Sequence, residues 1–273
     1  MDQSFRDPAA TLARSGLSAK KGLSQNFLVD GVIARAILDA LPEEPGSVIE
    51  IGAGPGTMTR ALAQTRRAVA AVELDERLLP VLRRETGDLA NVTVVAGDAM
   101  DLSLAGLLPP PYAVFGNIPY HITGLLVPRL LDLQPAPQWV CVLVQLEVAE
   151  RLSAEPGGWS LATLAVRSAA TAELLFRVPA RAFDPAPKVD SALVLLRPRP
   201  RAAFADDAFF DFARAVFQER RKQLTNAVAN AFGHDLERGR EVVARSGIEG
   251  TRRPQTLDLG EWERLYTAYR EVA

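Results

Sequence analysis

The sequence predicts an α/β protein: a doubly wound, mostly parallel, Rossmann-like sheet with a smaller C-terminal helical subdomain. Between residues 47 and 145, short continuous apolar runs alternate with helical patterns, which is typical of buried parallel strands in βαβ units. A glycine-rich turn follows the first run, at the edge where open α/β sheets bind ligands. Beyond Pro198 and Pro200 the pattern is helical to the end of the sequence.

The elements are predicted in the following order. Strands are expected at the apolar runs 48–51, 69–73, 92–95, 113–116 and 139–144, and helices at 32–41, 57–67 and 77–85. Further on, residues 147–153 and 161–170 have helical patterns. Residues 173–178 and 191–197 are predicted to add two strands that close the sheet with an antiparallel edge. The connection 179–190 contains Pro185 and Pro187, so we expect a rigid loop.

The chain of 273 residues is long enough for one large domain or two ordinary ones. We expect a first domain over residues 1–200, which opens with a basic segment at 1–24, and a helical subdomain over 201–273. In the first helix predicted for the subdomain, five apolar side chains share one face: Phe209, Phe212, Ala213, Val216 and Phe217.

Composition excludes several classes of protein. Hydrophobic residues make up 48% and charged residues 23%, so global disorder is excluded. No run approaches 18 apolar residues and no signal-peptide pattern opens the sequence, so we expect a cytoplasmic protein without a membrane span. Cys141 is the only cysteine, and His121 and His234 are the only histidines, so we expect neither a disulfide framework nor a metal site. A net charge of -2 means that a nucleic-acid surface must be a local basic cluster.

Residues 50–56, Glu-Ile-Gly-Ala-Gly-Pro-Gly, lie between a predicted strand and a predicted helix. Glycines let a ligand approach the backbone closely, and the start of a helix offers unpaired N–H groups. The dinucleotide fingerprint requires a third glycine where this chain has Thr57. The turn therefore suits a nucleoside with a charged tail, and a nicotinamide-dependent oxidoreductase is the less favoured alternative.

Acidic side chains end the second and third predicted strands. Glu73 is placed to accept hydrogen bonds from a ribose diol, and Asp98 to accept one from an adenine amino group. Asp75 is an alternative to Glu73 as the acceptor for the ribose, although a role in capping the following helix is the simpler interpretation. Because the carboxyl ends of parallel strands meet at one edge, we expect these side chains to lie near the glycine turn.

The fourth predicted strand ends in Asn117-Ile118-Pro119-Tyr120. This segment offers an amide oxygen, a backbone carbonyl and an aromatic face to one planar base. The alternative is an Asx-type turn followed by a buried tyrosine.

Together these segments resemble the S-adenosylmethionine-dependent rRNA adenine N6-dimethyltransferases, a family with a small-subunit branch and an erythromycin-resistance branch. The resemblance covers nearly the whole chain and includes residues 20–28, 145–152 and 183–192 as well as the motifs above. It implies a class I methyltransferase fold over residues 1–200 and rRNA recognition by residues 201–273. It also implies S-adenosylmethionine as the cofactor.

The two branches are separated by different segments. Residues 24–27 and 115–120 are spelled much as in the resistance methylases, whereas 178–183, 217–226 and 247–265 resemble the small-subunit branch. Because the C-terminal subdomain selects the RNA in this family, we expect a small-subunit enzyme. The chain also departs from the family pattern: Ala53 replaces a common proline, a second asparagine near His121 is missing, and no arginine follows Trp159 closely. We expect the first two departures to leave the cofactor site functional.

The resemblance implies dimethylation of N6 of two adjacent adenines in the 3′-terminal hairpin loop of 16S rRNA, within the small ribosomal subunit, and a role in subunit maturation. A 23S rRNA methyltransferase of the macrolide-resistance type and a non-catalytic assembly factor are the alternatives. We expect a monomer that binds no metal and no membrane.

The resemblance also carries over individual roles. Catalytic roles fall to Asn117, Pro119 and Tyr120. The implied cofactor contacts are Gln25, Asn26, Leu28, Gly52, Gly54, Glu73, Asp98, Ala99 and Asn117. Candidate RNA contacts are Lys20, Lys21, Phe183, Arg220, Arg221, Lys222, Arg252 and Arg253. For Asn26 a helix cap, for Phe183 core packing and for the basic residues a solvated surface are the alternatives.

Overall fold

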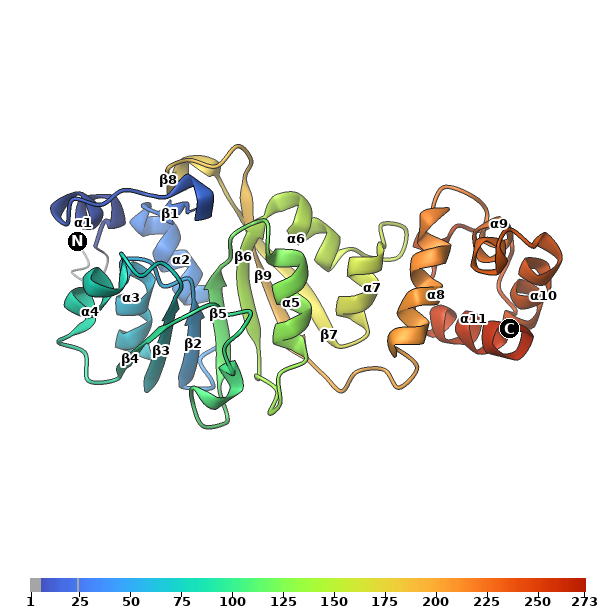
Figure 1. Cartoon of the computed structure of the whole chain (residues 1–273), viewed down its shortest axis with the longest axis horizontal. Helices are drawn as coiled ribbons and strands as arrows, with labels where there is room; N and C mark the ends of the chain where they lie inside the picture. Colours follow the sequence, from blue (N-terminus) through green and yellow to red (C-terminus); the bar gives the residue numbers. More distant parts are fainter. Residues whose placement is uncertain (1–5, 24) are drawn as a thin grey trace. The chain divides into compact units, whose positions relative to one another are not determined.

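A seven-stranded sheet organises the larger part of the computed structural model, which describes residues 6–23 and 25–273 (Figure 1). Its strand order is β4-β3-β2-β5-β6-β9-β7. The five strands of the parallel part are β2 (Ser47–Ile51), β3 (Ala68–Glu73), β4 (Val92–Ala96), β5 (Ala113–Asn117) and β6 (Val140–Gln145). Strand β9 (Ser191–Pro198) pairs antiparallel with β6, and β7 (Ala170–Val178) forms the edge. The predicted doubly wound fold with an antiparallel addition is confirmed.

Buried apolar residues explain why the central strands form. The last four residues of β2 and the last five of β3 are buried, as are all but the final residue of β5 and of β6. Such strands are covered on both faces, as is usual in parallel sheets. Cys141 lies in this core, and burial raises the pKa of its thiol, so it is an inert packing residue.

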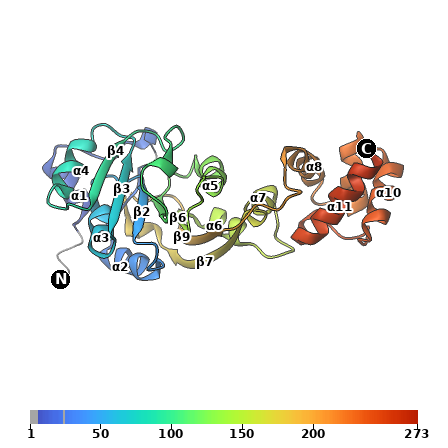
Figure 2. The same ribbon diagram turned by 90° about the horizontal axis from the view of Figure 1, so that it is seen from below.

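The helices that cover the sheet are α2 (Gly31–Ala40), α3 (Thr57–Thr65), α4 (Leu79–Thr86), α5 (Thr123–Leu131) and α6 (Leu146–Ser153). Of these helices, α2, α3, α4 and α6 begin within two residues of the predicted positions, whereas α5 was not predicted. The two views place α2 and α3 on one face of the sheet and α5 on the other (Figures 1 and 2). Asp30 caps α2 by accepting from the main-chain N–H groups of Val32 and Ile33, so Asn26 is not this cap.

A two-stranded sheet joins the N-terminal segment to the connection between β7 and β9. In it, β1 (Phe27–Leu28) pairs antiparallel with β8 (Phe183–Asp184). The short 3-10 helix η3 (Ala180–Ala182) precedes β8, so the expected loop 179–190 contains regular structure. Helix α1 (Pro8–Arg14), capped by Asp7, precedes this segment, and the 3-10 helix η1 (Lys21–Leu23) leads into β1. None of these elements was predicted, because each is too short for a hydrophobic period.

The contacts divide the chain into two units. The first contains residues 1–149 and 173–198, and the second contains residues 150–172 and 199–273. The second unit therefore starts its long C-terminal stretch next to the expected boundary, and it also includes a segment that we expected in the first domain.

Six helices build most of the second unit within residues 150–172 and 199–273. They are α7 (Leu161–Arg167), α8 (Asp207–Gln218), α9 (Leu224–Ala229), α10 (Leu236–Ser246), α11 (Leu259–Val272) and the 3-10 helix η5 (Pro254–Thr256). Their core includes the expected face of α8 together with Trp159 and Trp262. The ring of Phe217 stacks on Trp262 with a centroid distance of 5.1 Å. This unit thus has a hydrophobic core of its own.

Two features are absent from residues 6–23 and 25–273. No helix there combines the length and apolarity needed to cross a bilayer. No set of three or more His, Cys, Asp or Glu side chains in the same residues is grouped to hold a metal ion.

Candidate functional site

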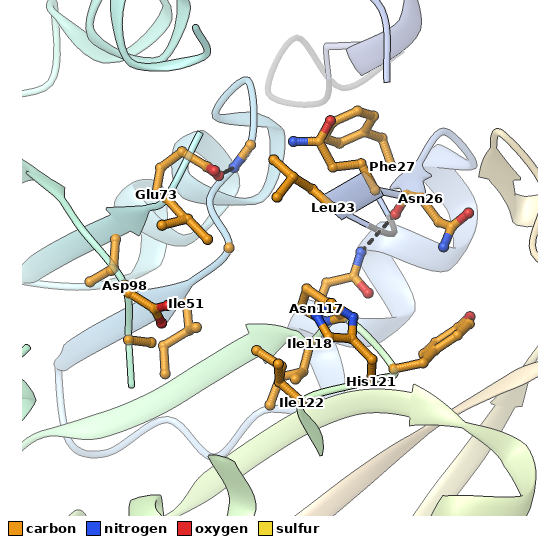
Figure 3. A pocket seen from close by; sticks show the side chains of 18 of the residues that line it. Leu23, Asn26, Phe27, Ile51, Glu73, Asp98, Asn117, Ile118, His121 and Ile122 are labelled. Atoms are coloured by element: carbon orange, nitrogen blue, oxygen red, sulfur yellow. Dashed lines mark hydrogen bonds between the residues drawn. The ribbon is translucent and has the colours of Figure 1, made fainter. Parts of the chain in front are cut away.

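A pocket of about 170 Å³ lies at the carboxyl ends of β2, β3, β4 and β5 (Figure 3). It is lined by residues from the N-terminal segment, the glycine turn and the three strand ends singled out in the sequence. Of the expected cofactor and catalytic residues it includes Gln25, Asn26, Gly52, Gly54, Glu73, Asp98, Ala99, Asn117, Pro119 and Tyr120. Residues as far apart in the sequence as Leu23 and Ile122 thus line one pocket.

The glycine turn approaches the pocket in a conformation that favours glycine. Gly52 and Gly54 have φ values of 76° and 57°, which side chains rarely adopt. A Cβ on Gly54 would also approach the ring of Phe27 to 2.9 Å. Both glycines therefore keep the backbone open toward the pocket.

Glu73 joins the glycine turn to the end of β3. One carboxylate oxygen accepts from the main-chain N–H of Gly54 at 2.7 Å (Figure 3). The other accepts from the main-chain N–H of Asp75 at 2.7 Å. The side chain is 6% exposed, and burial raises its pKa above the ordinary value, although the backbone hydrogen bonds oppose this shift. Each oxygen retains a lone pair with which it can accept from a ligand hydroxyl.

Asp75 closes the turn before α4 in a cap-like contact, because its Oδ1 accepts from the main-chain N–H of Arg77 at 3.2 Å, and it also has two side-chain partners. It forms an ion pair with Arg77 at 2.6 Å, and it accepts from the side-chain amide of Gln25 at 3.0 Å. The Arg77 hydrogen bond lowers the pKa of Asp75 to about 2. Helix α4 starts at Leu79 without a side-chain cap. Asp75 therefore anchors Gln25 and the N-terminal segment over the sheet edge.

Asp98 follows β4 and directs its carboxylate to the pocket wall. Its Oδ1 accepts from the main-chain N–H of Met100 at 2.8 Å, which fixes the turn. Among the described residues no donor reaches Oδ2. Ala99, which is buried beside it, belongs to the same wall. One carboxylate oxygen is thus available to a donor on a ligand.

Asn117 is oriented by the N-terminal segment. Its side-chain Nδ2 donates to the main-chain oxygen of Asn26 at 3.0 Å (Figure 3). Because the amide nitrogen is held there, the amide oxygen is left as an acceptor in the pocket, and within residues 6–23 and 25–273 no donor reaches it.

Two backbone carbonyls in the loop after Asn117, those of Pro119 and Ile118, differ in whether a donor reaches them. That of Pro119 accepts from the main-chain N–H of Ile122 at 3.1 Å and from the hydroxyl of Thr123 at 3.4 Å. That of Ile118 has no donor among the described residues. Ile118 therefore has the better acceptor for a ligand. Tyr120 also lines the pocket, and its hydroxyl lies 2.9 Å from that of Ser191.

Several wall residues had no signal in the sequence. They are apolar residues that were not among the predicted site residues: Leu23, Phe27, Ile51, Val72, Leu74 and Ile122. His121 lines the pocket as well and is exposed. Apolar residues at strand ends look like core residues in a sequence, so only the strand register could have identified them.

Two expected site residues lie in the core of the first unit. Leu28 is 5% exposed and Phe183 is 3% exposed, and they face each other in the β1–β8 pair. Neither lines the main pocket. In this conformation Phe183 offers no face to a base, as the packing alternative anticipated.

A smaller cavity of about 40 Å³ lies next to the main pocket and shares Phe27, Gly52 and Asn117 with it. Glu50 lines this cavity, is 2% exposed, and has one carboxyl oxygen without a hydrogen-bond partner in the described chain. Burial, with a smaller contribution from Glu73, raises the pKa of Glu50 to about 8. Glu50 is therefore a neutral acid over most of the physiological pH range.

The basic residues of the second unit gather from two segments. The main-chain N–H of Leu224 donates to the oxygen of Arg252 at 2.7 Å, which brings residues 220–224 beside 250–253. The exposed members are Arg220, Arg221, Lys222 and Arg253, which we call the basic cluster. Arg252 instead pairs with both carboxylate oxygens of Glu261 and donates to the main-chain oxygen of Thr256 at 2.6 Å.

In the N-terminal segment, Lys20 is exposed, and its main-chain N–H donates to the side chain of Gln25 at 2.8 Å. The side chain of Lys21 lies outside the described part of the structure.

Known proteins resemble this chain over most of its length. Residues 16–265 match the model of the family described as ribosomal RNA adenine dimethylase. The "Ribosomal RNA small subunit methyltransferase A" of Dehalococcoides mccartyi is 37% identical over 262 residues, which cover 93% of this chain and 90% of that protein.

Two solved structures share the fold. A dimethyladenosine transferase from Plasmodium falciparum aligns with a TM-score of 0.75 at 24% identity, and the alignment covers 90% of this chain and 98% of that one. The 23S rRNA methyltransferase ErmE aligns with a TM-score of 0.67 at 29% identity, and the alignment covers 90% of this chain and 100% of that one.

Proposed function

Because the chain belongs to the ribosomal RNA adenine dimethylase family, we propose that it transfers methyl groups from S-adenosylmethionine to adenine N6 in small-subunit rRNA. The proposed products are two adjacent N6,N6-dimethyladenines in the 3′-terminal hairpin loop of 16S rRNA. The proposed setting is the maturing small subunit in the cytoplasm. The observation that carries this proposal is the Asn117 side chain, whose amide nitrogen is held by Asn26 so that its oxygen serves as an acceptor in the pocket.

The small-subunit substrate is supported by similarity over 93% of the chain. The relative from Dehalococcoides mccartyi, named a small subunit methyltransferase, is 37% identical, whereas ErmE is 29% identical. The likeness to ErmE makes large-subunit rRNA the second candidate substrate.

The pocket fits S-adenosylmethionine as judged by its donors and acceptors. The glycine turn leaves room that a Cβ would fill, Glu73 presents a buried carboxylate for the ribose, and Asp98 has an unused oxygen for the adenine amino group. Ile51, Val72 and Leu74 supply apolar surface for the ring. When bound, S-adenosylmethionine supplies an electrophilic methyl group.

The protein's own task is to make the acceptor nitrogen reactive. The N6 lone pair of adenine is delocalised into the ring, so the amino group is a weak nucleophile. We assign to the Asn117 side-chain oxygen and the Ile118 carbonyl the acceptance of the N6 hydrogens, two in the first transfer and one in the second. This favours a pyramidal nitrogen with a localised lone pair, an effect of positioning and electrostatics. The nitrogen loses one proton to solvent for each methyl group that it gains. Pro119 contributes by shaping the turn, because its own carbonyl is already engaged.

The target base must leave its RNA stack to reach this pocket. Tyr120 provides the aromatic face on which the extruded adenine stacks, an interaction worth roughly 1–3 kcal/mol per base. The basic cluster of the second unit contacts the phosphate backbone, because exposed arginine and lysine are suited to phosphates.

The substrate is tested by incubating the protein with labelled S-adenosylmethionine and either unmodified small subunits or unmodified large-subunit rRNA. We expect label only in the former, as dimethyladenosine near the 3′ end. Label in large-subunit rRNA alone would favour the second candidate. Titration of the protein with S-adenosylmethionine and with NADH, followed by calorimetry, tests the cofactor separately, and binding of NADH alone would refute the proposal.

A further inference from the structure

Tyr120 is tied to a residue outside its own loop. Its hydroxyl lies 2.9 Å from the hydroxyl of Ser191, and either oxygen can be the donor. The two residues are 71 positions apart in sequence. Tyr120 lies on the loop between β5 and α5, whereas Ser191 is the first residue of β9.

Ser191 is a fixed point of the first unit. It is 1% exposed and pairs in register with Gln145 of β6. Its neighbour Asp190 is held on both sides: its carbonyl accepts from Leu146 at 2.9 Å, and its carboxylate accepts from the main-chain N–H of Ala180 at 2.8 Å. A hydroxyl held by this strand can therefore restrain Tyr120, which lies in the loop between β5 and α5.

Stacking alone does not require a tyrosine, because a phenylalanine presents the same kind of face to a base. The hydroxyl adds a single anchor at the far end of the ring. Burial raises the pKa of Tyr120, so the phenol stays neutral and keeps its proton for a hydrogen bond. The anchor thus limits how far the ring can rotate and tilt.

We propose that Ser191 is a positioning residue for the methyl acceptor, because its hydrogen bond to Tyr120 fixes the plane on which the target adenine stacks. The inference rests on the proposed function. It assigns to Ser191 no contact with the cofactor or with the RNA, since Ser191 acts through the Tyr120 ring.

The test is a double-mutant cycle of Ser191→Ala, Tyr120→Phe and the double variant, with small subunits as substrate. Each single variant should lower kcat/KM for the RNA by about 3- to 10-fold, the range of one missing hydrogen bond, and leave the Kd of S-adenosylmethionine unchanged. The kcat/KM of the double variant should be no lower than that of the less active single variant. Wild-type activity of Ser191→Ala, or losses that multiply in the double variant, would overturn the inference.

Ser246→Ala is the matched control, because Ser246 is also buried and donates to the main-chain oxygen of Val243 at 2.8 Å in the second unit. Ser246→Ala should lower the free energy of unfolding about as much as Ser191→Ala does, but it should leave kcat/KM unchanged. A spectroscopic readout is independent of activity: with ¹³C-labelled tyrosine, Tyr120→Phe identifies the Tyr120 signal among the four tyrosines. Ser191→Ala should shift that signal and speed its ring flips, whereas Ser246→Ala should not.

The outcomes also separate the inference from the proposed function. If the wild type modifies neither RNA, the proposed function fails and the inference with it. If the wild type is active and Ser191→Ala matches it in both rate and ring signal, only the inference fails.

Discussion

The side-chain nitrogen of Asn117 donates to the main-chain oxygen of Asn26 at 3.0 Å, across 91 positions of sequence. Two motifs that look independent in the sequence are therefore one structure: the N-terminal segment orients the amide that we assign to the target adenine. Gln25, bonded to Asp75, and the β1–β8 pair hold that segment in place.

The orientation of Asn117 can be tested without removing its oxygen. Asn117→Asp keeps the shape of the side chain but loses the donor and faces the Asn26 carbonyl with a carboxylate oxygen. We expect methyl transfer to fall about 10²–10³-fold, as when one preorganised active-site group is removed. Single-turnover transfer measures this effect, and calorimetry with the cofactor provides the control. An aspartate variant as fast as the wild type would show that the hydrogen bond to Asn26 is irrelevant.

Glu50 should make stability depend on pH. Its pKa is about 8 in the folded protein and near its ordinary value of 4.5 in the unfolded chain. Between these values the unfolded chain releases the proton first, so the free energy of unfolding falls, as pH rises, by up to about 1.4 kcal/mol per pH unit. Below pH 4.5 this loss is absent, and above about 8 it stops growing.

The Glu50→Gln variant has no titratable group at this position, so its stability lacks this dependence on pH. In urea titrations without added cofactor, its stability relative to the wild type should rise from about pH 5 to about pH 8. Parallel pH profiles of the two proteins would contradict the neutral buried state of Glu50.

The basic cluster should determine the salt dependence of RNA binding. Arg221→Glu combined with Lys222→Glu should weaken binding and reduce the slope of log K against log salt by about 0.7 to 0.9 for each phosphate that the protein no longer neutralises. Arg240→Glu, on the exposed side of α10 and outside the cluster, is the matched control and should keep the slope. An unchanged slope in the double variant would mean that these side chains only solvate the surface.

Alanine variants of the neighbouring residues Arg252 and Arg253 should differ in their effects: the first should lower stability, and the second should weaken RNA binding. Arg252→Ala removes the hydrogen bonds to Glu261 and Thr256, and should lower the free energy of unfolding by about 1–2 kcal/mol because the pair is only partly exposed. Arg253→Ala should change stability by less than about 0.5 kcal/mol while weakening RNA binding. Urea unfolding and filter binding of both variants measure the difference. Equal stabilities would refute the structural role of Arg252.

The fold was largely predictable because its central strands are buried on both faces. The runs at 48–51 and 69–73 differ from β2 and β3 by one residue at the start of each strand. The pair of β1 and β8 was not predictable, because two-residue strands have no period and their partner lies more than 150 residues away in sequence. Residues 150–172 join the second unit through packing contacts that no local pattern indicates.

The candidate site was predictable where chemistry and strand ends coincide, as at Glu73, Asp98 and Asn117. Sequence could not show that the two oxygens of Glu73 accept from the main-chain N–H groups of Gly54 and Asp75. Nor could it show that the carbonyl of Ile118, rather than that of Pro119, lacks a donor among the described residues. These distinctions depend on hydrogen-bond partners that no sequence pattern reveals. The cofactor and RNA roles of the individual residues stay predictions.

The most direct measurement of the central claim is methyl transfer by Asn117→Ala to unmodified small subunits, with cofactor binding measured on the same preparation. The account predicts that transfer falls by at least about 10²-fold while the variant still binds S-adenosylmethionine. Transfer at the wild-type rate would show that the Asn117 oxygen does not activate the adenine, and it would contradict the mechanism.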